Sequence, residues 1–76
     1  MEDYYKKKEI VCENLAKFLI DNHVHSELLS LKYTINDQTK DEIVTATYKS
    51  GGTRKINVSA DSLMAMVRDI LKNIGY

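Results

Sequence analysis

Cys12, His23 and His25 are the residues whose types could support a reactive or metal-binding centre. His23 and His25 are two positions apart, so an extended chain would place both imidazoles on the same side. A protein zinc site takes four ligands, or three and a water. The missing ligands would have to be Cys12 with Asp21 or Glu27, at no recognisable zinc spacing. We therefore predict no metal site and no cofactor, with both imidazoles exposed at a helix end.

Catalytic groups are equally sparse. A cysteine nucleophile needs a thiolate beside a base in a cleft, whereas Cys12 lies at the margin of an apolar helical stripe and is expected to be a buried, inert thiol. The adjacent carboxylates Asp41 and Glu42 are expected to be solvated at the end of an element. Gly51-Gly52 fits a turn and precedes no helix, so it is not a phosphate-binding loop. We predict that the protein is not an enzyme.

Length and charge limit the remaining classes. A chain of 76 residues is expected to form one domain, residues 1–76, around a single core. Its formal net charge is zero, which argues against a surface dominated by phosphate binding. One cysteine, no signal-peptide-like start and no apolar run of membrane-spanning length predict a cytoplasmic protein without membrane contact.

Residues 3–22 have the spacing of an amphipathic helix. Apolar residues recur every three or four positions and so fall within one arc at 3.6 residues per turn. The predicted core-facing residues are Tyr4, Val11, Leu15, Phe18 and Leu19, with Cys12 and Ala16 at the margin. Ile10 and Ile20 fall outside the arc and are expected to be exposed. Asn22, which tolerates a left-handed conformation, is the expected end of the helix.

The middle of the chain predicts three strands. In residues 31–36 apolar and polar side chains alternate, as in a half-buried strand, and residues 36–41 are rich in turn formers. The stretch 42–59 predicts a hairpin with a three-residue loop, Ser50 to Gly52. That loop would place Ala46 opposite Ile56 and put Gly52 at a positive φ, because this register gathers the apolar residues on one face.

The last helix is expected to begin after Ser59, which can cap it, with Val58 and Leu63 forming a hydrophobic staple. Its core stripe is predicted to comprise Leu63, Met66, Val67, Ile70 and Ile74. The sequence therefore predicts an α+β domain in α-β-β-β-α order, with a three-stranded antiparallel meander and both helices packed on one face.

This order of elements resembles the double-stranded RNA-binding domain, whose length is also similar. The resemblance covers the whole chain, but it consists of topology alone. Members of that family have a basic cluster at the start of the last helix and a loop with glycine and histidine after the first strand. The corresponding stretches here, residues 59–62 and 36–41, are both acidic, so no functional residue is carried over from the family.

The candidate functional surface is the sheet face that the helices leave uncovered, together with the hairpin tip. It is expected to be flat, threonine-rich and mildly basic, because basic residues outnumber acidic ones between positions 30 and 59. The predicted partner-binding residues are Ile43, Thr45, Thr47, Lys49, Arg54 and Lys55. Free edge strands offer a second way to pair with another chain.

From these features we expect a small binding or regulatory module that acts through contacts with a partner protein or with a second copy of itself. The many lysine, asparagine, isoleucine and tyrosine residues suit an A+T-rich genome, such as that of a phage or mobile element. An inhibitor or adaptor of a larger complex would fit that origin. The alternative is nucleic-acid binding, with Lys49, Arg54 and Lys55 of the hairpin as phosphate contacts.

Overall fold

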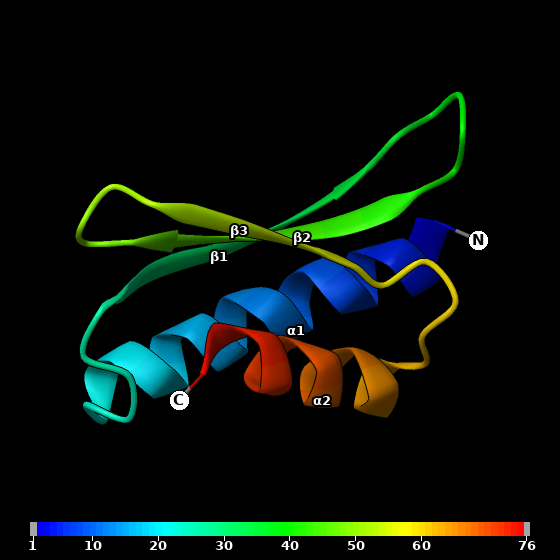
Figure 1. Ribbon diagram of the computed structural model, residues 1–76. Helices are drawn as coiled ribbons and strands as arrows, with labels where there is room; N and C mark the ends of the chain where they lie inside the picture. Colours follow the sequence, from blue (N-terminus) through cyan, green and yellow to red (C-terminus); the bar gives the residue numbers. More distant parts are fainter. Residues whose placement is uncertain (1, 76) are drawn as a thin grey trace.

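Two helices lie side by side beneath a three-stranded antiparallel sheet (Figure 1). This computed structural model describes residues 2–75, and the side chains of residues 5–75. The elements are α1 (Glu2–Asp21), β1 (Leu28–Ile35), β2 (Glu42–Tyr48), β3 (Thr53–Asn57) and α2 (Leu63–Ile74). The predicted α+β class, the element order and the placement of both helices on one face are confirmed.

The hydrophobic core fills the space between the sheet and the helices. Alternate residues of β2, such as Val44 and Ala46, are fully buried and point toward the helices. The other core residues are Cys12, Ala16, Leu19, Leu28, Leu31, Tyr33, Ile56, Val58, Met66, Ile70 and Ile74. Because both helices cover the same side, the opposite side of the sheet is left without a layer of its own (Figure 1).

The buried side of α1 differs from the predicted arc. Phe18, predicted in the core, is 56% exposed, whereas Cys12 is fully buried and Ile20 packs partly against the core. The buried side of α1 is rotated away from the predicted arc and includes Lys8, a residue with no apolar signal that is completely buried. Tyr4 lies outside the side chains that the structure describes.

The β2–β3 loop has the predicted length, but it begins one residue earlier. Val44 lies opposite Ile56 and Ala46 opposite Arg54, so the predicted pairing of Ala46 with Ile56 is wrong by two residues. The loop is residues 49–51, closed by a hydrogen bond from the Tyr48 amide to the Gly52 carbonyl (2.9 Å). A shift of two residues keeps every side chain on its predicted face, since side chains alternate with a period of two.

The start of α2 also differs from its prediction. Ser62 caps the helix, and its hydroxyl accepts a hydrogen bond from the amide of Ala65 (3.2 Å). Ser59 instead accepts a hydrogen bond from the amide of Glu42 (2.8 Å) and so ties the end of β3 to the start of β2. The predicted cap and its staple are therefore wrong. The side chain of either serine could cap a helix. Ser59 is held by its contact with the sheet, and Ser62 caps α2.

At the hairpin loop we expect Gly51, not Gly52, to be the sensitive glycine. Gly51 has φ +95°, a conformation that L side chains rarely adopt, although a methyl group added there would meet no atom within 4 Å. Gly51→Ala should therefore lower the free energy of unfolding by about 1–2 kcal/mol through backbone strain alone. Gly52→Ala is the matched control and should change it little. Urea melts in which the two variants lose equal stability would contradict this loop conformation.

Candidate functional site

Three rows of side chains cross the uncovered face of the sheet. Cross-strand partners in an antiparallel sheet point to the same side, so the pairing of β2 with both neighbours defines each row. The rows are Ser30–Thr47–Thr53, Lys32–Thr45–Lys55 and Thr34–Ile43–Asn57. We call these nine residues the open face. Its members on β1 and β3 are exposed, and those on the central strand are half-buried.

The open face has an uneven charge for a chain of zero net charge. Lys32 and Lys55 flank Thr45 on either side. Since neighbouring strands are about 4.8 Å apart, the two lysines start from backbone positions about 10 Å apart. The nine residues, all within the described part of the chain, include neither a carboxylate nor an aromatic ring. A partner's acidic group placed over Thr45 would meet an ammonium group on each side.

The predicted partner-binding residues do not all share this surface. Ile43, Thr45, Thr47 and Lys55 lie together on the open face. Lys49 is the first residue of the β2–β3 loop, at one end of the sheet. Arg54 pairs with the buried Ala46 and is therefore on the helix-facing side of β3, where it is exposed at the edge.

A buried polar cluster lies on the other side of the sheet. The Lys8 ammonium contacts the Glu42 carboxylate at 2.7 Å, and their side chains are 0% and 6% exposed. Lys8 also donates to the Val58 carbonyl (3.2 Å), and the Tyr33 hydroxyl donates to Glu42 (2.8 Å). The expectation that Glu42 is a solvated carboxylate is therefore wrong. No pattern in the sequence marks the pair, since Glu42 simply begins a strand and Lys8 stands in a run of three lysines.

Cys12 and His25, two of the three residues considered for chemistry, make structural contacts. Burial raises the pKa of the Cys12 thiol to about 11, so the nucleophilic thiolate is disfavoured, and its sulfur lies 4.0 Å from that of Met66. His25, expected to be exposed, is half-buried and its Nε2 lies 3.0 Å from the Ile74 carbonyl at the end of α2. No group of three or more metal-ligating side chains occurs among residues 5–75. The absence of catalysis and of a metal site both stay predictions.

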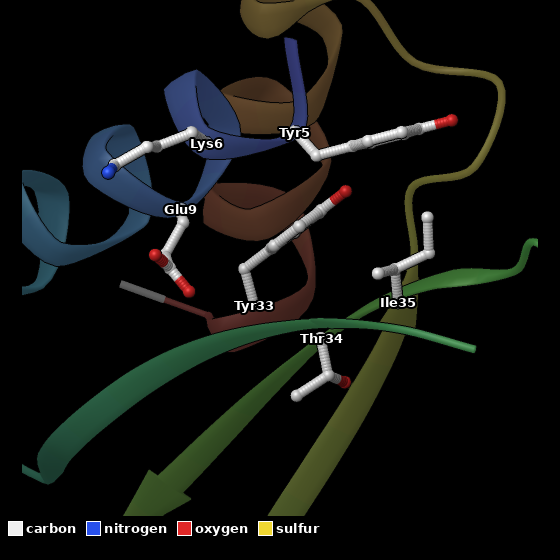
Figure 2. A pocket seen from close by; sticks show the side chains of 6 residues that line it. All are labelled: Tyr5, Lys6, Glu9, Tyr33, Thr34 and Ile35. Carbon is white, nitrogen blue, oxygen red and sulfur yellow. The ribbon is translucent and has the colours of Figure 1, made fainter. Parts of the chain in front are cut away.

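An open groove of about 420 Å³ lies between α1 and the end of β1 (Figure 2). It is lined by Tyr5, Lys6, Glu9, Tyr33, Thr34 and Ile35. The side chain of Thr34 points to the other side of the strand, toward the open face, while that of Tyr33 points toward α1 (Figure 2). The groove is thus shallow and mixed in character, and its shape suits a chain lying along it better than an enclosed small molecule.

No family model, curated protein or solved structure matches this chain. In the structure, Asp61 and the capping Ser62 precede Leu63 at the start of α2. This helix start therefore lacks the basic cluster of the double-stranded RNA-binding domain. None of the described helices is long and apolar enough to cross a membrane.

The Lys8–Glu42 pair should be essential to stability. Lys8→Met leaves the Glu42 carboxylate buried without its counter-ion, which should lower the free energy of unfolding by about 3–5 kcal/mol. Adding Glu42→Gln should recover most of the loss, since the amide oxygen can still accept from Tyr33. Lys7→Met, on the exposed side of the same turn, is the control. Equal urea midpoints for Lys8→Met and Lys7→Met would show that the pair contributes nothing.

The Asp61 carboxyl should make stability depend on acidity. Its hydrogen bond with the Asp69 carboxyl raises the pKa of Asp61, as do burial and the charge of Asp69, while Lys8 opposes the shift. A raised pKa in the folded state means that the pair stabilises the fold at low pH, and that this contribution is lost as pH rises through the raised value. We therefore expect Asp61→Asn to raise the melting temperature at pH 7.

The gain from Asp61→Asn should vanish near pH 3, where the Asp61 carboxyl of the parent protein is protonated in both the folded and the unfolded state. Asp37→Asn, in the exposed β1–β2 loop, serves as the control and should show no such pH dependence. Melting curves at the two pH values test this directly. A lower melting temperature for Asp61→Asn at pH 7 would mean that its attraction to Lys8 outweighs the repulsion from Asp69.

Proposed function

We propose that this protein is a small binding module that regulates a partner protein through the open face. The observation that carries the proposal is the composition of that face: hydroxyls and two lysines, with no carboxylate among its nine described residues, in a chain of zero net charge. The buried sides of both helices pack against the sheet, whereas none of the described elements covers the open face.

The chemistry of the open face suits a flat protein surface that presents acidic side chains. Lys32 and Lys55 would pair with carboxylates on the partner, and complementary charge of this kind sets specificity and association rate. The threonines are stiff at χ1, so little side-chain entropy is lost when they are held in an interface. Ile43 adds an apolar contact in the row next to the lysines.

A protein partner is favoured over a nucleic acid by two features. Proteins that bind single strands on a sheet stack bases on aromatic side chains, and no aromatic ring occurs on the open face as described. Duplex RNA binding by the related topology needs cations at the start of the last helix, where this chain has Asp61, Ser62 and Leu63. Nucleic-acid binding is therefore the alternative that the experiment below must exclude.

The composition supports a regulator of phage or mobile-element origin, acting as an inhibitor or adaptor of a larger host complex. The buried free thiol of Cys12 is suited to a reducing compartment, which supports the proposal of a cytoplasmic action.

The test is an affinity purification from native lysate with a charge-reversed open face. Thr45→Glu, Thr47→Glu and Lys55→Glu together should abolish recovery of the partner, because an acidic partner surface would be repelled. The helical circular dichroism signal should stay unchanged, since these side chains point away from the core. If the folded triple variant recovers the same proteins as the parent, the open face is not the binding surface.

The matched control places the same change in net charge on α1, with Lys7→Glu and Lys17→Glu at exposed positions. This variant should keep the partner. Half of each lysate is treated with nuclease before purification. Recovery that disappears with nuclease, and that falls with salt at a log–log slope near −3 expected for about three phosphate contacts, would replace the protein partner with nucleic acid.

A further inference from the structure

β1 is an edge strand, and the hydrogen-bond pattern identifies which of its main-chain groups face outward. The amide of Tyr48 donates to Gly52 on the β3 side (2.9 Å). Main-chain groups alternate in direction along an antiparallel strand, so Ile43 directs its groups toward β1, where it pairs with Thr34. The next residue along β1, Ile35, therefore directs its N–H and C=O away from the sheet.

The same alternation turns the main-chain groups of Leu31 outward, so the edge repeats donor and acceptor groups at every second residue. The side chains of these outward-facing positions point toward α1, in the direction of the groove. A free edge of this kind is a template for another strand. At β1 the template is combined with a groove that can receive the side chains of an added chain.

The groove has a different chemistry at each end. Tyr5 and Ile35 form one end, while the Glu9 carboxylate lies on the side of Tyr33 away from Ile35 (Figure 2). Lys6 is part of the wall, but its ammonium points away from the centre of the groove (Figure 2). One end therefore suits an apolar side chain and the other a cationic one.

We propose that β1 and this groove bind an extended peptide segment of a partner protein, added as a fourth strand antiparallel to β1. Residues on the same side of a strand are about 6.6 Å apart, so two inward side chains of the peptide reach the two ends of the groove. An antiparallel peptide passes Ile35 before Tyr33. Its sequence is therefore apolar, any residue, then arginine or lysine, with the cation directed to Glu9.

The opposite edge offers no equivalent site. β3 has five residues, with the charged Arg54 and Lys55 in its centre, and charged side chains on an edge discourage strand addition. β3 lines neither the groove beside β1 nor the smaller one formed by Val24, His25, Ser26, Glu27 and Gly75. Peptide binding at β1 also does not require the open face, because the inward side chains of the peptide lie on the other side of the sheet.

The experiment titrates a seven-residue peptide into the ¹⁵N-labelled protein and follows the amide resonances by NMR. The peptide has leucine at position three and arginine at position five, with threonine at the other positions. The Leu31 and Ile35 amides should shift, with a dissociation constant of about 1 mM or tighter. Methylating the peptide nitrogen at position three, which faces β1, should weaken binding about fivefold or more. Methylating position four, which faces solvent, should not.

Variants of the protein locate the contact independently. Glu9→Lys should weaken binding about fivefold or more, whereas Glu13→Lys, one turn further along α1 and outside the groove, should not. Ile35→Pro removes an outward N–H and should weaken binding relative to Ile35→Val. The variant with Thr45→Glu, Thr47→Glu and Lys55→Glu should bind the peptide normally, which separates this proposal from the open face.

Equal binding of the two methylated peptides, no amide shift at Leu31 and Ile35, or indifference to Glu9→Lys would each overturn the proposal. A dimer by light scattering that Ile35→Pro converts to a monomer would also overturn it. In that case β1 would pair with a second copy of this chain rather than with a partner peptide.

Discussion

The rest of the structure depends on one buried ion pair, Lys8 with Glu42. The Lys8 ammonium joins α1 to the first residue of β2 and to the Val58 carbonyl just beyond β3. Removing both charges from water is costly, and only close geometry with further hydrogen bonds offsets that cost. The Tyr33 hydroxyl supplies one such bond. A domain of this size is stable by only a few kcal/mol, so an unpaired charge at this position would be enough to unfold it.

The ion pair also explains why α1 lies under the sheet in one orientation. An apolar stripe alone would tolerate small rotations of the helix, whereas a buried ammonium must stay within reach of its carboxylate. With Lys8 directed inward, Phe18 falls on the solvent side and Cys12 meets Met66 of α2. Both helices are thereby committed to one face. The open face and the β1 edge are the parts of the sheet that we propose meet other molecules.

Much of the fold could be predicted from the sequence because it follows from short-range periodicity. The alternation in residues 31–36 and the apolar spacing of residues 66, 70 and 74 each place an element and its buried side. Register and caps depended on choices between near-equivalent neighbours. Gly51 and Gly52 could each take the left-handed position, and Ser59 and Ser62 could each cap a helix; the contacts with Glu42 and Tyr48 decided between them.

The proposed binding surfaces were predictable to different degrees. Because a register error of two residues preserves the face, Thr45, Thr47 and Lys55 were grouped correctly although their exact partners were not. Arg54 was predicted at the hairpin tip beside Lys49, and its pairing with Ala46 places it in β3 on the helix-facing side. The groove beside β1 left no sequence signal, because it brings together residues of α1 and β1 that are more than twenty positions apart. The buried pair was missed for the same reason.

Site-specific photocrosslinking tests most directly whether the open face is the binding surface. A photoreactive phenylalanine analogue replaces either Thr45, at the centre of the open face, or Lys17, on the exposed side of α1. Irradiation in native lysate, followed by mass spectrometry of the covalent adducts, identifies what each position touches. We expect a defined protein adduct from position 45 and none from position 17. Adducts from position 17 alone would show that the partner binds the helices, and the open face would then be only a solvated surface.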